Sequence, residues 1–403
     1  MVSDLLQQYI RLWWYCERSL PNFGITTSRN EQVECEKRLE KLVNGLVYEL
    51  KRIPQSPEEP LAWQKGLRPG FIELARMVLH LEQPQLDFIE SSGMLEANLE
   101  FTRIARKFDP CISAEDIYQA GRNVMTANFF QLLFGLPVEV TPSIFAYSML
   151  YPYTDNYFDD PTISMKTKLT FNKRFLNRLQ GKTVPPENPQ EEIINSLVHM
   201  IENQWDRQQY PQVYESLMAI HAAQASSLGL ILPGASPFEL DVLGISFEKG
   251  GTSVLADGYL VAGNLTPEQA SVMFGYGAFT QLIDDLEDIQ HDFQEGRMRI
   301  FSQTASHWPL DGLTNRLFSF GREILDDLKA FHSPSVPALS ELISRSIDPV
   351  FIDTVGRAGN YYSKEYLHEI ERHFSFRFAF LRKQREKLFR QKIDFGKMID
   401  SMI

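Results

Sequence analysis

The feature that most constrains this chain is an acidic stretch at the end of a long apolar segment, NLTPEQASVMFGYGAFTQLIDDLEDIQHDFQEGRMRIFS (264–302). Thr266, Pro267 and Gln269 predict the N-cap, first position and capping box of a helix that continues to about Asp292. Residues three or four apart share a helix face. The polar face holds Gln281, Asp285, Asp288 and Asp292, with Asp284 beside them, and the other side holds Phe279, Leu282, Ile283, Leu286 and Ile289.

A second acidic stretch, YPYTDNYFDDPT (151–162), also follows an apolar segment and contains no Lys or Arg. Asp155, Asp159 and Asp160 lie where Pro161 is expected to end a helix. Their charges repel one another and face the negative end of the helix dipole, at a cost of roughly 0.3–1 kcal/mol each. A bound cation would remove this conflict.

Taken alone, each stretch is typical of a solvated helix surface. Both, however, carry the spacing DxxxD, at 155–159 and 284–288. Two such acidic faces placed opposite each other would repel unless divalent cations lay between them. Mg²⁺ prefers oxygen ligands and usually binds one or two carboxylates together with substrate phosphates and water. The pair of stretches therefore predicts a site for Mg²⁺ and a diphosphate.

Helical periodicity extends over nearly all of the 403 residues, with breaks at proline-rich segments, so we expect an all-α protein. The clearest strand alternative is FSFRFAF (374–380), whose flanks are helical in pattern. We expect an N-terminal helical segment, 1–110, packed on a main body, 111–403. This body would carry a basic C-terminal helix.

Composition narrows the function. The net charge of −12 argues against general binding of nucleic acid. The three cysteines, Cys16, Cys35 and Cys111, are widely spaced, which favours a reducing, cytoplasmic setting over a disulfide framework. No uninterrupted apolar run reaches about 18 residues, so a membrane span is not expected.

At this point the motifs resemble those of a known family. GYGAFTQLIDDLEDI is similar to the second aspartate-rich motif of trans-prenyl diphosphate synthases, a DDxxD with a glutamine, here Gln281, three residues before it. FEKGGTSVLADGYLVAG (247–263) resembles the Lys-Thr helix that leads into that motif. DNYFD (155–159) resembles the first motif, with Asn156 in place of its second aspartate. The resemblance covers roughly residues 115 to 302.

The resemblance implies the class I isoprenoid synthase fold, an antiparallel helical bundle around a deep apolar cavity. It also implies three Mg²⁺ ions and a prenyl diphosphate bound between the two motifs. The implied catalytic metal ligands are Asp155, Asp159, Asp284, Asp285 and Asp288. Asn156 and Gln281 are expected to contact the substrate.

Two departures from the family bear on the reaction. The Gly-Gly-Lys-Arg and Arg-Arg-Gly stretches of chain-elongating members are absent, which points to the use of one prenyl diphosphate. The ordinary terpene cyclase signature is absent too. The DNxxD form with a long N-terminal helical region is similar to the bacterial large-terpene synthases, the tetraprenyl-β-curcumene synthase group. We therefore expect a Mg²⁺-dependent terpene synthase, a lyase that ionises one long prenyl diphosphate.

Two other functions stay open. One is a prenyltransferase that condenses two substrates through a second site. The other is a non-catalytic regulatory or carrier subunit of the same fold, against which the near-complete acidic motifs argue. A homodimer is left open.

Further candidates for substrate contact lie on the flanking helices. Lys249, followed by Gly250 and Gly251, would contact diphosphate if the glycines mark a kink or a close backbone approach; an interhelical turn is the alternative. Arg122, with Asn123 and Asn128 nearby, precedes the first motif and would point into the site or form a surface salt bridge.

The C-terminal part offers three interpretations. Arg357, Tyr361, Tyr362 and Lys364 would form a lid that closes over diphosphate. From Arg372 to Lys397 there are nine Lys/Arg and two acids, which favours a helix on an anionic membrane surface or a solvated helix that balances the acidic body.

Aromatic residues near the motifs would guide a carbocation or pack in the core. They are Phe145, Tyr147, Tyr151, Phe158, Phe274 and Phe279.

Overall fold

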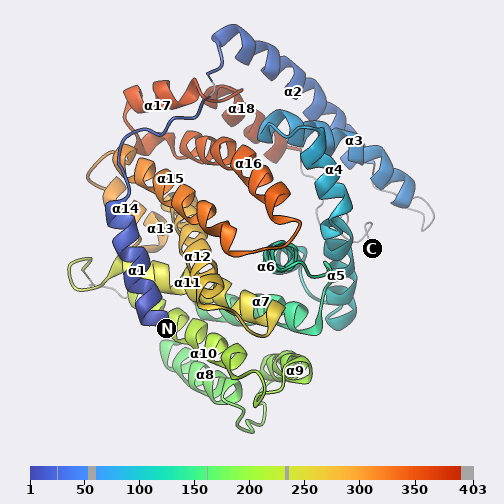
Figure 1. Ribbon diagram of the computed structural model, residues 1–403, viewed down its shortest axis with the longest axis vertical. Helices are drawn as coiled ribbons and strands as arrows, with labels where there is room; N and C mark the ends of the chain where they lie inside the picture. The colour runs from blue at the N-terminus through green and yellow to red at the C-terminus, as the bar shows by residue number, and fades with distance from the viewer. Residues whose placement is uncertain (25, 53–59, 161, 232–235, 392–403) are drawn as a thin grey trace. The chain divides into compact units, whose positions relative to one another are not determined.

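The computed structural model describes residues 1–24, 26–52, 60–160, 162–231 and 236–391. Across these ranges the regular structure is helical and no β-strand occurs, so the predicted all-α class is confirmed (Figure 1). The strand alternative at 374–380 is wrong, because helix α18 (Phe378–Phe389) begins inside it. Within the same ranges, no helix has both the length and the apolar character needed to cross a bilayer.

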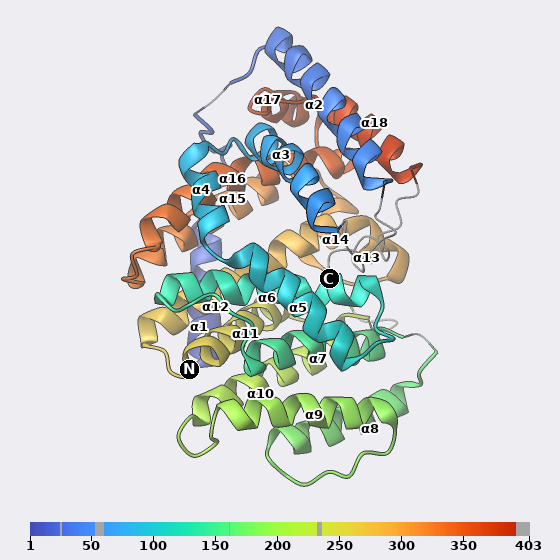
Figure 2. The same cartoon turned by 90° about the vertical axis from the view of Figure 1, so that its right-hand side faces the viewer.

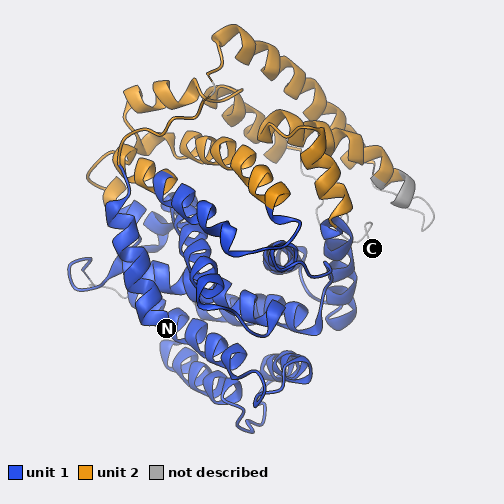
Figure 3. Ribbon diagram, viewed as in Figure 1, with its two compact units in different colours: residues 1–17, 93–303, 319–336 blue, residues 18–92, 304–318, 337–403 orange. Residues whose placement is uncertain are grey.

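The chain divides into two compact units that differ from the expected division near residue 110 (Figure 3). Unit 1 comprises residues 1–17, 93–303 and 319–336, and unit 2 comprises 18–92, 304–318 and 337–403. The first helix belongs to unit 1 because its apolar face is buried there: Tyr9 stacks on Phe274, and Trp13 packs edge-on against Phe247. A continuous N-terminal segment is therefore not a unit of this fold.

Unit 1 contains most of the helices drawn in Figure 1. Their bounds are α1 (Val2–Tyr15), α5 (Met94–Phe108), α6 (Ala114–Phe134), α7 (Pro142–Asp159), α8 (Met165–Leu179), α9 (Pro189–Gln204), α10 (Pro211–Ser227), η1 (Leu228–Ile231), α11 (Val242–Ala262), α12 (Pro267–Glu287), α13 (Ile289–Glu295) and η2 (Asp327–Ala330). Figure 2 shows α8, α9 and α10 side by side in this unit.

Unit 2 is also helical. Its bounds are α2 (Arg29–Leu50), α3 (Pro60–Leu79), α4 (Gln83–Ser91), η3 (Gly359–Tyr361), α17 (Lys364–Glu371) and α18. Three helices contribute residues to both units: α14 (Ile300–Ala305), α15 (Asp311–Asp326) and α16 (Val336–Arg357).

Local sequence explains where the site helices begin. The hydroxyls of Ser113 and Thr141 accept hydrogen bonds from backbone N–H groups at the first turns of α6 and α7. Thr266 and Gln269 form the predicted capping box of α12. In each case an N-terminal donor that the helix leaves unpaired is satisfied by a nearby side chain.

The ends of the two acidic helices differ from each other. Helix α7 ends at Asp159, as expected before Pro161, which lies outside the described residues. The predicted helix to Asp292 is wrong, because α12 ends at Glu287 and α13 begins at Ile289. Asp288 interrupts the helix with φ −90° and ψ 5°. Like charges four residues apart destabilise a helix, and a continuous helix would place Asp284, Asp288 and Asp292 at that spacing, which gives a physical reason for the break.

Helices α11 and α12 approach each other closely at glycine. A Cβ atom on Gly250 would lie 2.3 Å from the carbonyl oxygen of Gly277, and one on Gly277 would lie 2.1 Å from that of Gly250. A Cβ on Gly251 would lie 2.6 Å from the Phe274 ring. Helix α11 runs without interruption through both glycines. The glycines therefore mark a close backbone approach, and the break or turn considered for 249–251 is wrong.

Candidate active site

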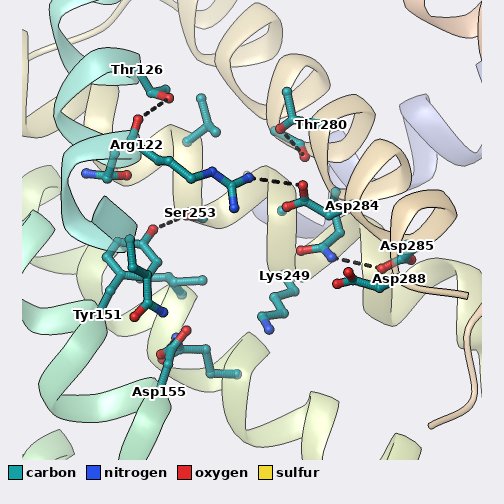
Figure 4. Close-up of a pocket in the computed structure, with 18 of the residues that line it drawn as sticks. Arg122, Thr126, Tyr151, Asp155, Lys249, Ser253, Thr280, Asp284, Asp285 and Asp288 are labelled. Atoms are coloured by element: carbon teal, nitrogen blue, oxygen red, sulfur yellow. Dashed lines mark hydrogen bonds and ion pairs between the residues drawn. The ribbon is translucent and has the colours of Figure 1, made fainter. Parts of the chain in front are cut away.

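A cavity of about 480 Å³ lies within unit 1 (Figure 4). Its walls come from α6, α7, α10, α11, α12 and α13, and from the segment that follows α13. Lining residues recur at helical intervals; on α11 they include Lys249, Ser253 and Asp257, each four positions after the last. Each helix thus presents one face to the cavity.

One wall is acidic. Asp284 and Asp285 lie in the last turn of α12, Asp288 lies at its end, and Asp292 lies on α13; all four line the cavity. Asp285 is 3% exposed. It accepts hydrogen bonds from the Ser246 hydroxyl, at 2.8 Å, and from the side-chain amide of Gln281, at 2.9 Å. The predicted second acidic face therefore points into a cavity.

The first acidic stretch reaches the same cavity through Asp155. In Figure 4, Asp155 comes from α7 on one side, Asp284, Asp285 and Asp288 come from α12 on the other, and Lys249 lies between them. The side-chain amide of Gln224 on α10 donates to Asp155 Oδ1 at 2.6 Å. Carboxylates that are far apart in sequence thus share one site.

Basic side chains partly balance these carboxylates. Arg122 Nη2 lies 3.2 Å from Asp284 Oδ1, and Arg299 Nε lies 3.6 Å from Asp285 Oδ1. Arg299 is 7% exposed, and its Nη1 makes no hydrogen bond. A buried guanidinium donor without a partner is costly, and it would suit an anionic ligand in the cavity.

Burial raises the pKa of several of the acids. Burial raises the pKa of Asp284 to about 6. Arg122 lowers this pKa, and Asp285 and Asp288 raise it further. The Asp284 side chain is nevertheless 45% exposed, because it borders the open cavity. Burial brings the pKa of Asp292 to about 7 against the lowering effect of Arg299, and it raises the pKa of Asp288. Negative charge on this wall is therefore under-compensated by the protein alone.

The acidic wall fits a divalent cation in its donor chemistry. Asp292 is 3% exposed, and its Oδ2 accepts no hydrogen bond, so a buried carboxylate oxygen is available. Among the described side chains, no three from His, Cys, Asp and Glu are grouped closely enough to hold a metal ion alone. The side chain of Asp159 lies outside the described residues. Oxygen atoms of a substrate diphosphate would complete such a site, as they usually do for Mg²⁺.

Of the other site residues predicted on these helices, some line the cavity and some do not. Arg122, Gln281, Lys249 and Gly250 line the cavity, as does Asn123. The remaining three predicted on these helices do not line it: Asn156 is exposed and donates to Asp116, Gly251 packs on Phe274, and Asn128 is fully buried.

The predicted lid residues belong to unit 2, whereas every residue that lines the cavity belongs to unit 1. Arg357 pairs with Asp353 at 3.4 Å. Tyr362 is 8% exposed, and its hydroxyl lies 2.8 Å from that of Thr314 in the same unit. A lid formed by Arg357, Tyr361, Tyr362 and Lys364 stays a prediction.

The basic C-terminal stretch makes ion pairs in its described part. Arg377 and Arg385 pair with Glu36 and Asp353, and Lys387 lies 3.6 Å from Glu40. These contacts favour the interpretation in which the helix balances acidic groups of the protein. Residues 392–397 lie outside the described residues.

Most of the aromatic side chains near the motifs pack in the core. Phe145, Phe274 and Phe279 are at most 3% exposed and do not line the main cavity. Tyr151 alone of the predicted six lines it. Tyr147 and Phe158 line smaller hollows beside it.

A cluster of polar side chains outside the two motifs lines the cavity or lies beside it. The hydroxyls of Tyr151 and Ser253 lie 2.5 Å apart, and the Tyr147 hydroxyl donates to the Ser253 carbonyl at 3.2 Å. Asn123 donates to Asp257 Oδ1 at 3.0 Å. Burial raises the pKa of Asp257 well above its usual range.

Several residues that line the cavity were not predicted from the sequence as site residues. Gln224 on α10 and the two arginines after α13 come from segments without a recognised motif, so only the fold reveals them. Asp257 carried a signal, since it is the one carboxylate in the apolar stretch VLADGYLVAG. These residues are Gln224, Ser253, Asp257, His291, Arg297 and Arg299.

Comparison of the chain with models of protein families and with curated protein sequences finds no match.

Proposed function

We propose that this protein is a Mg²⁺-dependent class I terpene synthase that ionises a single prenyl diphosphate, with a long-chain substrate expected from the motif resemblance. One observation carries the proposal: Asp155 from the first acidic stretch and Asp284, Asp285 and Asp288 from the second line the same cavity. A volume of about 480 Å³ also falls within the range of about 300–1,000 Å³ that is usual for small-molecule sites.

The residues present divide into metal-binding and anion-binding groups. Asp155, Asp284, Asp285 and Asp288 would hold the metal, together with Asp159. Bound Mg²⁺ supplies Lewis-acid stabilisation of the charge that develops on the leaving diphosphate oxygen. Arg122, Lys249 and Arg299 would bind the diphosphate, because each is a cationic side chain that lines the cavity.

Positioning follows from the hydrogen bonds of the free protein. Gln281 and Ser246 hold the buried Asp285 carboxylate in one orientation. Gln224 does the same for Asp155. Preorganised groups of this kind stabilise developing charge without a further cost of reorientation, which is the main source of acceleration expected here.

The first experiment measures diphosphate release by the purified protein with Mg²⁺ and prenyl diphosphates from C10 to C35, with and without isopentenyl diphosphate. Release in the absence of isopentenyl diphosphate is expected. Chain elongation that occurs only with isopentenyl diphosphate would instead identify a prenyltransferase. No release from any substrate would favour a binding or regulatory subunit.

The second experiment tests the site. Asp285→Asn should lower the rate of diphosphate release by about 10²–10³-fold, because it removes a charge from the acidic wall while nearly preserving side-chain shape. Glu287→Gln is the matched control: it removes a charge two residues away, at an exposed position that does not line the cavity. Equal rates in the two variants, with unchanged helicity, would contradict the assignment of Asp285.

A further inference from the structure

Asp257 lies on the same face of α11 as Lys249 and Ser253, and all three line the cavity. At a rise of 1.5 Å per residue, Asp257 is about 12 Å along the helix from Lys249. Ser246, which holds Asp285, lies at the other end of this face. A ligand whose diphosphate sits at the acidic wall would therefore extend its hydrocarbon chain towards Asp257.

The surroundings of Asp257 leave half of its carboxyl group unused. The residue is 2% exposed. Oδ1 accepts a hydrogen bond from Asn123, whose amide also donates to the Ser148 hydroxyl at 3.0 Å. Oδ2 has no hydrogen-bond partner. A buried carboxyl oxygen without a partner costs roughly 1–3 kcal/mol, so the position is poorly explained by stability.

A purely structural role would account for only one of the two oxygens. The bond from Asn123 ties α11 to α6, and an asparagine at 257 would accept it equally well. What an amide lacks is a negative charge and the ability to take up a proton. The residue type therefore matters to a ligand rather than to the tie between helices.

We propose that Asp257 is a catalytic base that ends the reaction by accepting a proton from the hydrocarbon cation; this role rests on the proposed function. A C–H bond next to the cationic carbon breaks, its electron pair becomes the new C=C bond, and the proton passes to Oδ2. The protonated carboxyl group returns its proton to solvent when the product leaves. The step uses the ionised carboxylate. Burial raises the pKa of Asp257 and disfavours this form in the free protein, whereas a hydrocarbon cation formed beside it favours the form strongly where little water is present.

The test compares the wild type with Asp257→Asn, using the prenyl diphosphate between C10 and C35 from which the wild type releases diphosphate fastest. Products are counted per diphosphate released, so that any change in the rate of ionisation does not enter the comparison. The share of the main wild-type olefin among the products, measured by gas chromatography and mass spectrometry, should fall at least about tenfold. Other olefins, or an alcohol formed by water, would take its place. An unchanged product profile would overturn the proposal.

Asn128→Leu is the matched control. Asn128 lies on α6, is fully buried and has no hydrogen-bond partner for either side-chain polar atom, but it does not line the cavity. This substitution should change stability without changing the product profile. The same shift in products as in Asp257→Asn would mean that the profile reports general repacking, which would overturn the proposal.

A binding measurement separates this inference from the proposed function. The probe is a farnesyl chain with a tertiary amine in place of one internal carbon, compared with the uncharged carbon analogue. The amine should lose at least about tenfold in affinity on Asp257→Asn, and the carbon analogue should not. If the wild type releases no diphosphate, the proposed function fails, and this measurement still decides whether Asp257 attracts a cation. Equal affinities in the two proteins would overturn the proposal.

Asp257→Ser provides a second variant in case the asparagine variant does not fold. It removes the charge with a smaller side chain, and the same product and binding measurements apply. If neither variant reaches the helicity of the wild type, Asp257 is a structural residue and the proposal fails.

Discussion

Asp292 is a buried carboxylate close to other acidic side chains, so its titration should change the free energy of unfolding of the protein. Arg299 and Arg297 face it with positive charge, and Asp285 and Asp288 face it with negative charge. Its pKa of about 7 in the folded protein exceeds the ordinary value of 3.8. Because the folded state binds this proton more tightly than the unfolded state, the contribution to stability is fully present below about pH 4 and is lost as pH rises to about 7.

We predict that Asp292→Asn reduces this loss of stability, measured as the free energy of unfolding in denaturant at pH 5 and pH 8. The wild type should lose more stability than the variant over that interval, by about 1–3 kcal/mol. Asp160→Asn is a suitable control, since hydrogen bonds from Thr162 lower the pKa of Asp160. Parallel pH profiles for wild type and Asp292→Asn would contradict the assignment.

At the residue scale, the DxxxD pattern picked out carboxylates that line one cavity, because the side chains on a helix face repeat at helical spacing. Asp155, Asp284, Asp285 and Asp288 were found in this way. Asn156 was misplaced, since one step along α7 turns its side chain to an exposed position. Gln224 and Arg299 were not found because they depend on tertiary packing between segments with no pattern of their own.

At the scale of elements, α11 and α12 depend on glycine for their separation. We predict that Gly250→Ala destabilises the protein by about 1–3 kcal/mol or more, because a Cβ would meet the Gly277 carbonyl oxygen at 2.3 Å and force the two backbones apart. The measurement is chemical denaturation followed by circular dichroism.

Gly45→Ala on α2 provides the comparison. A Cβ at Gly45 meets nothing within 4 Å, so only helix propensity changes. This substitution should stabilise the protein by about 0.5–1 kcal/mol. Destabilisation of similar size in both variants would contradict the close approach of α11 and α12.

Element starts were easier to predict than element ends. The capping box at Thr266 is local, and it appears as expected. The end of α12 depends on charge repulsion within the acidic row, which periodicity does not weigh against helix propensity. The role of Gly250 and Gly251 could not be decided from the sequence either, because adjacent glycines in a helix are expected both at a kink and at a close approach between helices.

At the scale of the whole molecule, the two units are built from separate stretches of chain, and α1 is part of unit 1. We predict that Trp13→Ala costs about 3–5 kcal/mol, because this fully buried ring packs against Phe247 and Phe320. Chemical denaturation of the full chain would measure the loss.

The neighbouring Trp14 is the control, with 59% of its surface exposed. Its replacement by alanine should change stability by no more than about 0.5 kcal/mol. A larger effect at Trp14 than at Trp13 would mean that α1 packs through its other face. The boundary expected near residue 110 failed because helical periodicity identifies a buried face without identifying what covers it.

The position of α1 has a consequence for how the protein is made. The Tyr9 hydroxyl donates to the carbonyl of Ser271, 262 residues further along the chain. On the ribosome, therefore, the first helix emerges long before its partners on α11 and α12 exist. Its apolar face, including Trp13, stays exposed until the chain has been synthesised as far as α12. Molecular chaperones recognise exposed apolar surfaces of this kind. Slow synthesis or early termination should leave nascent chains prone to aggregation.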